Sequence, residues 1–183
     1  MSTAFSPTKL LGRSLCSALL LLLAPLIAAA GGGATPLIET VHNATARYVD
    51  INVAFGEGFV VATPCVSGPD AGAMGVHLVL PSRLSKVVLN PEQPQALIYE
   101  PMANGAMRLV GVEFIVLEPI WAAANPKGGV PALDGNLMNY IASPNRYGLP
   151  AFYEIHVWAW ENNPLGSYAD WNTHVTCAHQ PNT

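Results

Sequence analysis

The chain of 183 residues carries little charge, because only 11% of its residues are Asp, Glu, Lys or Arg. Twelve acidic residues outnumber eight basic ones, which gives a formal net charge of −4. A net negative protein is a poor partner for nucleic acid or for an anionic membrane surface, so we expect neither. The length suits one domain with a hydrophobic core of its own.

The first part of the chain has the three regions of a secretory signal peptide. Lys9 and Arg13 precede a nearly unbroken apolar run over 15–27, and Ala28-Ala29-Ala30 follows as a small-residue cleavage site. The apolar run is shorter than the roughly 20 residues that cross a bilayer. Pro25 also interrupts it. An uncleaved membrane anchor is the alternative that this pattern leaves open.

Cleavage would leave one exported domain. We predict that residues 1–30 are removed and that residues 31–183 form a single secreted or periplasmic domain without a membrane attachment. The leader contains two of the eight basic residues and no acidic residue, so the domain keeps six basic and twelve acidic residues. Its partners are therefore expected to be a small molecule or a metal ion.

A helix is expected to follow the leader. Thr35-Pro36 combines a capping hydroxyl with a proline in the first turn, a typical helix start. Apolar side chains then recur three or four residues apart over 41–59. The spacing predicts one amphipathic helix that lies on a sheet and ends near Gly56 and Gly58.

The next segment, residues 61–72, is predicted to be a loop because of its proline and glycine content. It contains Cys65, and the only other cysteine after the leader is Cys177. An even number of cysteines in an exported protein favours a disulfide, here Cys65–Cys177. Two buried thiols or a thiolate metal site are the alternatives.

Three strands are expected next, over 73–80, 96–100 and 108–117. The last two are joined at Asn104-Gly105, a pair that strongly favours a hairpin turn between apolar runs.

The turn also predicts the register of this hairpin. With Asn104-Gly105 at its centre, Glu100 lies opposite Leu109, and Ala96 lies opposite Glu113. The two glutamates then share a face but lie too far apart to bind one ion together unless the sheet coils strongly.

The rest of the chain is expected to complete an α+β domain. Residues 118–150 form a long connection whose apolar content favours an ordered cover over the fold. Residues 151–161 read as a strand, and 168–177 as a last edge strand. The predicted fold is an N-terminal helix packed on a curved antiparallel sheet of about five strands, with a small antiparallel barrel as the alternative.

Ionisable residues inside the apolar strands are the candidate functional residues. Side chains alternate between the faces of a strand, so Glu154 and His156 share a face. Burying an unpaired carboxylate costs several kcal/mol, and His77 and Glu113 occupy other apolar strands. These four residues form a ligand set suited to a divalent metal such as zinc, manganese or iron.

Each of these residues also has an ordinary structural interpretation. His77 can be a hydrogen-bonded core histidine, and Glu113 can form a buried ion pair with Arg108, Arg83 or Arg146. The face that carries the Glu154 and His156 side chains can simply lie in solvent.

A pocket for a small ligand is expected beside the ionisable cluster. Phe152, Trp158 and Trp160 alternate onto the face of the last long strand that holds Glu154, and Glu100 lies on the neighbouring hairpin. We found no Walker lysine, no His-Glu-x-x-His helix and no Gly-x-Ser-x-Gly turn in the sequence.

Several motifs together resemble a group of small exported bacterial proteins of uncharacterised function. They are Gly-Ala-Met-Gly-Val-His at 72–77, Leu-Val-Gly-Val-Glu-Phe at 109–114, and Phe-Tyr-Glu-Ile-His-Val-Trp-Ala-Trp at 152–160. The resemblance spans roughly 40–177. It implies export and the placement of the two cysteines, and it implies no activity.

The sequence therefore favours an exported protein that binds a small ligand or a divalent metal in a pocket of histidine, glutamate and aromatic side chains. The alternatives are a metal-dependent or acid/base enzyme that uses the same pocket, with His156 as the base, and an interaction module that docks through the Trp158 and Trp160 strand.

Overall fold

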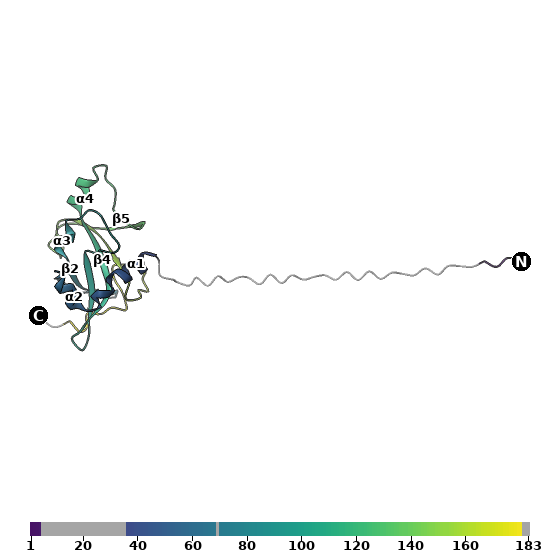
Figure 1. Ribbon diagram of the computed structural model, residues 1–183, viewed down its shortest axis with the longest axis horizontal. Coiled ribbons are helices and arrows are strands. Elements are labelled where there is room, and N and C mark those ends of the chain that lie inside the picture. Colours follow the sequence, from purple (N-terminus) through teal and green to yellow (C-terminus); the bar gives the residue numbers. More distant parts are fainter. Residues whose placement is uncertain (5–35, 69, 181–183) are drawn as a thin grey trace. The chain divides into compact units, whose positions relative to one another are not determined.

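The computed structural model describes residues 1–4, 36–68 and 70–180. The chain divides into two units, residues 1–32 and 33–183. Most of the predicted signal peptide, including its apolar run and cleavage site, lies outside the described residues. All of the described helices and strands belong to the second unit (Figure 1).

The N-terminal part of the second unit forms three short helical pieces and not the single helix expected. They are α1 (Pro36–Thr45), the 3₁₀ turn η1 (Ala46–Val49) and α2 (Ile51–Gly56). The break lies at Asp50, whose backbone is extended and whose side chain accepts a hydrogen bond from the Asn52 backbone nitrogen at 3.0 Å. A new helix capped by an aspartate begins there, and this local capping overrides the apolar spacing.

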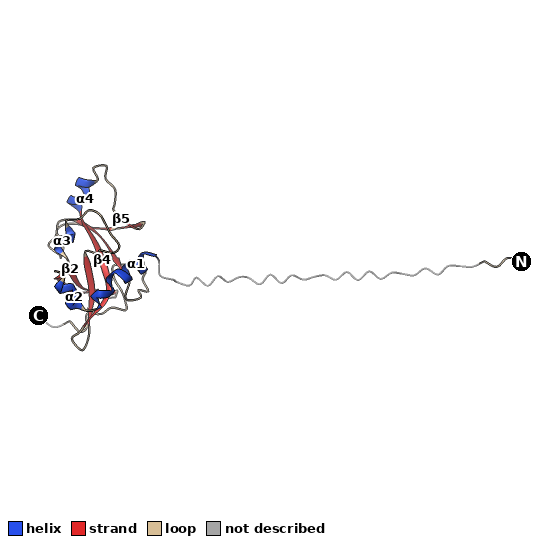
Figure 2. Ribbon diagram, in the orientation of Figure 1, coloured by secondary structure: helices blue, strands red, loops and turns tan. Residues whose placement is uncertain are grey.

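Two further short helices interrupt the strands. Helix α3 (Pro81–Leu84) follows the second strand, and α4 (Glu118–Ala124) opens the long connection. Both begin with proline in the first turn, where the missing N–H costs no hydrogen bond. Figure 2 shows the helices as short blue segments around the longer red strands.

Six antiparallel strands form one curled sheet in the order β1-β2-β3-β4-β8-β7. The bounds are β1 (Val60–Gly68), β2 (Gly72–Val79), β3 (Ala96–Pro101), β4 (Met107–Leu117), β8 (Phe152–Val157) and β7 (Asn139–Ile141). A separate pair consists of β5 (Ala132–Leu133) and β6 (Asn136–Leu137). The α+β fold with a curved antiparallel sheet is confirmed. Among the described strands, β1 and β7 are the two edges of the sheet, so it does not close into a barrel.

Strand β1 occupies the segment that was predicted to be a loop. It pairs with β2 through three irregularities in register, and it contains Pro64. Proline is tolerated in an edge strand or at a bulge, because it need not donate to a neighbour there. The predicted loop is therefore wrong, because this segment is a strand, although the strand is irregular around its proline.

The end of the chain also differs from the prediction. Strand β8 stops at Val157, and residues 168–177 form turns, with one isolated bridge between Ala73 and Asn172. The chain leaves the β4 ladder at Trp158, whose backbone nitrogen donates to the Ser167 carbonyl at 3.0 Å. This early exit gives the side chains beyond Val157 a different environment from the one that strand alternation predicts.

The hairpin of β3 and β4 turns where expected, but its loop holds three residues, 103–105, and not the expected two, because the Met102 backbone nitrogen donates to the Ala106 carbonyl at 2.9 Å. Ala96 lies opposite Glu113, as predicted, but Glu100 lies opposite Arg108 and not Leu109. The Glu100 pairing follows from the three-residue loop, because a two-residue turn centred on Asn104-Gly105 would pair Glu100 with Leu109. A register shift between Ile98 and Tyr99 then offsets the extra residue and restores the predicted pairing of Ala96 with Glu113. A bulge of this kind leaves an unpaired residue on one strand, and no residue type in the hairpin signals it.

The two faces of the sheet have different coverings. One face packs against the helical pieces through a core that includes Leu37, Val41 and Tyr48. The Tyr99 hydroxyl donates to the Tyr48 carbonyl at 2.7 Å and fastens the helical segment to this face. In Figure 1, α1 and α2 lie beside the long strand β4. The other face carries the ionisable residues.

Cys65 in β1 and Cys177 near the end of the chain form a disulfide, with their Cα atoms 5.6 Å apart. The expected pairing is therefore present, and it excludes the free-thiol and thiolate-metal alternatives. Disulfides are typical of proteins in oxidising compartments, which is consistent with the predicted export. Among the described residues we find no helix of sufficient length and apolarity to cross a membrane.

Candidate metal centre

Four ionisable side chains from three strands meet on the face opposite the helices. Strand β2 contributes His77, β4 contributes Glu113, and β8 contributes Glu154 and His156. All four are buried, with exposed fractions of 3% or less. The sequence prediction named these four residues, and the structure brings them together.

Three of the four side chains converge on one point. The Nε2 atoms of His77 and His156 lie 3.3 Å apart, and the His77 Nε2 atom lies 3.6 Å from Oε2 of Glu113. One ligand atom from each residue lies within 4.8 Å of the other two. In a tetrahedral zinc site with bonds of about 2.0 Å, neighbouring ligand atoms are about 3.3 Å apart. The two separations from His77 Nε2 are close to this value, and the three atoms, the donor triad, all lie within 4.8 Å of one another.

The other ring nitrogen of each histidine already has a partner. The His156 Nδ1 atom lies 2.9 Å from Oε2 of Glu154, and the His77 Nδ1 atom lies 3.3 Å from the Thr63 hydroxyl. A carboxylate only accepts, so the His156 Nδ1 atom carries the hydrogen. Metal-binding histidines typically donate from their second nitrogen in this way, which fixes the ring and directs its free nitrogen toward the metal.

A second acidic group lies behind Glu154. The side-chain nitrogen of Asn139 in β7 donates to Oε1 of Glu154 at 3.1 Å and to Oδ1 of Asp170 at 2.9 Å. Asp170 also approaches the His156 Nδ1 atom to within 4.0 Å. Glu154 is thus held by hydrogen bonds on both oxygens, and the His156 ring is held in turn.

Burial and mutual charge shift the pKa values of the triad. Burial lowers the pKa of His77 to about 3, and the neighbouring His156 adds to this shift. Burial likewise raises the pKa of Glu113 to about 8. For His156 burial favours the neutral ring, but the hydrogen bond to Glu154 and the charge of Glu113 outweigh it and raise the pKa to about 9.

These pKa values describe how the protons are arranged without a metal. With a charged His156 ring and a neutral His77 ring, these contacts are consistent with His156 donating to Glu154 through Nδ1 and to His77 through Nε2. His77 then carries its hydrogen on Nδ1, beside the Thr63 hydroxyl. The Nε2 electron pair of His77 accepts this hydrogen of His156, between the two rings. A metal ion at the centre of the triad replaces the shared proton, since imidazole binds metals in its neutral form.

Glu113 has no basic partner other than the histidines within the described part of the chain. Arg108 pairs with Glu100 and with Glu161, and Arg83 donates to the Pro94 carbonyl at 2.6 Å. The nearest basic side chain is the neutral ring of His77, whose Nε2 atom lies 3.6 Å from Oε2 of Glu113. The alternative of an ordinary buried pair between Glu113 and an arginine is therefore wrong for Arg108 and Arg83, and the structure gives no such pair for Arg146.

A cavity of about 180 Å³ opens beside the triad, with His77 and Glu113 in its wall. Tyr147 also lines it, and its ring packs edge-on against His77 with the ring centres 6.4 Å apart. Most of the remaining wall is apolar and includes Val60, Val79, Leu84, Ile115, Leu149 and Phe152. One side of the triad therefore faces a small, mostly apolar space.

Two of the four predicted pocket residues lie at this site. Phe152 lines the cavity and packs edge-on against Tyr147. Trp158 is buried and stacks near the His156 ring, with the ring centres 6.0 Å apart. Trp158 supports the site from the side and is not among the residues that line the cavity.

The other two predicted pocket residues lie elsewhere, which corrects the prediction. Trp160 stacks on His42 and donates to the Thr45 hydroxyl at 2.9 Å, on the helical side of the sheet, because the chain leaves the strand before it. Glu100 pairs with Arg108 and accepts a hydrogen bond from the Thr176 backbone nitrogen at 2.9 Å. It fastens the C-terminal segment and does not reach the triad.

Thr63, Tyr147, Asn139 and Asp170 contact the site and were not singled out from the sequence. Asp170 and Tyr147 lie in irregular segments, where alternation gives no direction for a side chain. Thr63 lies in β1, which was not recognised as a strand. Only Asp170 carried a signal, as an acidic residue in a chain with few charges.

Comparison of the chain with protein-family models, with curated proteins and with solved structures gives no match. The similarity to small exported bacterial proteins therefore stays a prediction. The chemistry of the site rests on its own geometry.

Proposed function

We propose that the exported domain binds a divalent metal ion, best suited to zinc, through His77, Glu113 and His156. The observation that carries the proposal is the spacing of the donor triad, with two imidazole nitrogens 3.3 Å apart and a carboxylate oxygen 3.6 Å from one of them. Two neutral imidazoles and one carboxylate are donors that zinc prefers, and manganese or iron(II) also accept them.

The burial of the triad supports a cation at its centre. A buried carboxylate without a basic partner is costly, and here Glu113, Glu154 and Asp170 gather around two histidines. A divalent ion offsets this negative charge more effectively than the single proton that His156 can supply. The two Nε2 atoms face each other at 3.3 Å, and the Glu113 carboxylate lies beside the Nε2 atom of His77, so a cation at this point would contact all three residues.

Metal-dependent catalysis is the second candidate function. Catalytic zinc sites keep three protein ligands and leave a position open to water or substrate. The open side of the triad faces the cavity of about 180 Å³, which favours this arrangement over a closed structural site. The interaction-module alternative has no such support, because Trp158 is only 4% exposed and Trp160 packs on His42.

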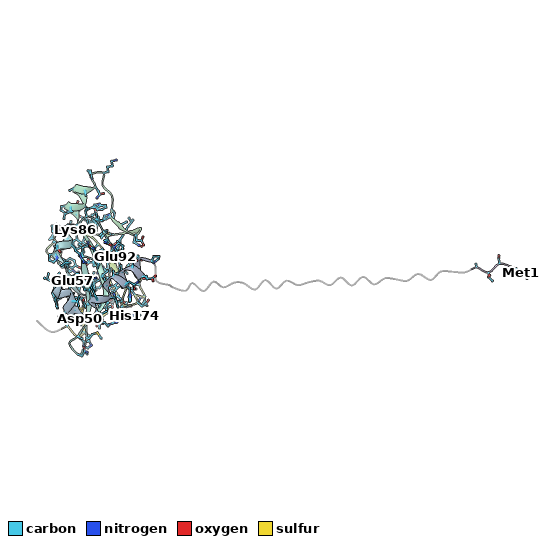
Figure 3. The ribbon with its side chains drawn as sticks, in the orientation of Figure 1. Met1, Asp50, Glu57, Lys86, Glu92 and His174 are labelled. Atoms are coloured by element: carbon cyan, nitrogen blue, oxygen red, sulfur yellow. A yellow bond between two sulfur atoms is a disulfide. The ribbon has the colours of Figure 1, made fainter. Side chains whose placement is uncertain are left out.

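The test is metal content and metal-dependent stability. Protein purified without added metal and then loaded with zinc should bind one ion per chain and melt at a higher temperature than the chelator-treated protein. His156→Ala should remove both effects. His174→Ala is the matched control, because the side chain of His174 is 48% exposed. His174 belongs neither to the donor triad nor to the neighbouring cluster of Glu154, His156 and Asp170 (Figure 3).

A second variant separates loss of binding from loss of folding. Glu113→Gln keeps the volume of the side chain and removes its charge, so the chelator-treated variant should fold and still fail to bind zinc tightly. Folded His156→Ala and Glu113→Gln proteins that bind zinc as the unmodified protein does would contradict the proposal.

A further inference from the structure

The cavity beside the donor triad points to a specific class of ligand. We propose that it holds a small, mostly apolar molecule whose single anionic head binds the metal at the open side of the triad. The inference rests on the proposed metal site and adds the chemistry of what meets the metal there.

The volume of the cavity limits the size of the ligand. The cavity measures about 180 Å³. An apolar protein cavity of about 150 Å³ is known to accept benzene. A ligand of roughly six to nine non-hydrogen atoms therefore fits, and a nucleotide, a sugar chain or a peptide does not.

The apolar wall of the cavity excludes a ligand whose main part, apart from its anionic head, is polar. Apart from His77, Glu113 and the phenol ring of Tyr147, the residues around the cavity are aliphatic, aromatic or proline. Helix α3 contributes Leu84 and β8 contributes Phe152. Hydroxyl or amino groups on the ligand body would lose their water and find no partner in such a wall. The body that this wall accepts is a hydrocarbon chain or ring.

The charge of the complex selects the head of the ligand. A divalent ion held by two neutral imidazoles and the carboxylate of Glu113 keeps one positive charge. Glu154 contacts His156 on the far ring nitrogen and does not line the cavity. The negative charge of Glu154 reaches the complex through His156, so the head that binds from the cavity side carries no more than a single negative charge, as a carboxylate, phenolate or thiolate does.

Strand β1 offers a matched pair of residues with which to test the cavity. Val60 lines the cavity and is 51% exposed, so it lies at the mouth. Val61 is 57% exposed and is not part of the wall, because the next side chain along a strand lies on the opposite face. A tryptophan at Val60 should fill the mouth, and a tryptophan at Val61 should leave it open.

The experiment uses cobalt(II) as a coloured substitute for zinc in the full exported domain. Benzoate and acetate, which share a carboxylate head, are titrated separately against the visible spectrum of the cobalt protein. Benzoate should bind about tenfold more tightly than acetate or better, because only its ring enters the apolar space. Val60→Trp should weaken benzoate binding by about tenfold, and Val61→Trp should leave it unchanged.

The outcomes separate the two proposals. Cobalt that binds while benzoate and acetate bind equally, or while both tryptophan variants behave alike, overturns the cavity proposal and leaves the metal site standing. A protein that is folded and takes up no cobalt or zinc overturns the metal site and the cavity proposal with it.

Discussion

Glu154 provides the sharpest test of how the metal centre works, because it contacts a proposed ligand without facing the cavity. Its Oε2 atom accepts from His156 Nδ1 at 2.9 Å, and its Oε1 atom accepts from Asn139 at 3.1 Å. Glu154→Gln keeps the shape of the side chain and removes its charge. The variant isolates the orienting hydrogen bond from the metal ligands themselves.

The size of the effect follows from these two hydrogen bonds. Loss of a partner that orients a metal-binding histidine typically costs 10- to 100-fold in affinity, or about 1.4 to 2.8 kcal/mol. We expect the upper end of this range for Glu154→Gln. A glutamine offers one acceptor oxygen, whereas His156 and Asn139 both donate to this position. One of the two donors must then face an amide NH₂ group.

The measurement is a competition titration in which the protein and a coloured chelator share a limited amount of zinc. The matched control is Glu92→Gln, because Glu92 is exposed and lies outside both the donor triad and the neighbouring cluster that contains Glu154 (Figure 3). The control should bind zinc as the unmodified protein does. Melting curves in the presence of chelator show whether the metal-free variants are folded.

An affinity for Glu154→Gln within about threefold of the unmodified protein would refute the reasoning, since threefold is well below the cost of a lost orienting partner. If His156→Ala abolished zinc binding in the same assay, His156 would remain a metal ligand, but Glu154 would have no orienting role.

The remaining predictions concern the framework and the leader. Replacing Cys65 and Cys177 by serine should lower the free energy of unfolding by about 4–5 kcal/mol in urea titrations, because the bond closes a loop of 112 residues. Gly75→Ala should cost well over 2 kcal/mol on the same measure and Gly105→Ala only about 1–2 kcal/mol. Both glycines have positive φ, but an added Cβ at Gly75 would lie 2.8 Å from the Tyr99 carbonyl, and Gly105 has open space. Mass spectrometry of the protein exported by its native host should show an N-terminus near Gly31, and an intact leader would contradict this prediction.

Local rules were sufficient to predict the four ionisable residues of the site, but not the residues that contact them. Glu154 and His156 share a face because strand side chains alternate. Ala96 lies opposite Glu113 as predicted only because the bulge in the hairpin offsets the extra residue in its loop. The scarcity of charge in the chain made His77 conspicuous. The two-residue alternation failed where the strand ended early, which removed Trp160 from the site.

Long-range pairing could not be read from the sequence. Strand β8 lies next to β4 although the long connection separates them, and this pairing places His156 directly opposite Glu113. Asp170 reaches His156 from a segment of turns near the C-terminus. Neither the order of the strands nor the path of such a segment follows from local patterns of apolar residues.

The curvature of the sheet decides whether the three ligands can meet at all. Strand β3 lies between β2 and β4, so His77 and Glu113 project from strands about 10 Å apart in a flat sheet. The β3 residues beside them are Ile98, opposite His77, and Ala96, opposite Glu113. Ala96 is small enough to leave space above β3, and curling of the sheet tilts the flanking side chains toward each other across it. A flat sheet with the same strand order would hold the same residues on the same face and would form no site.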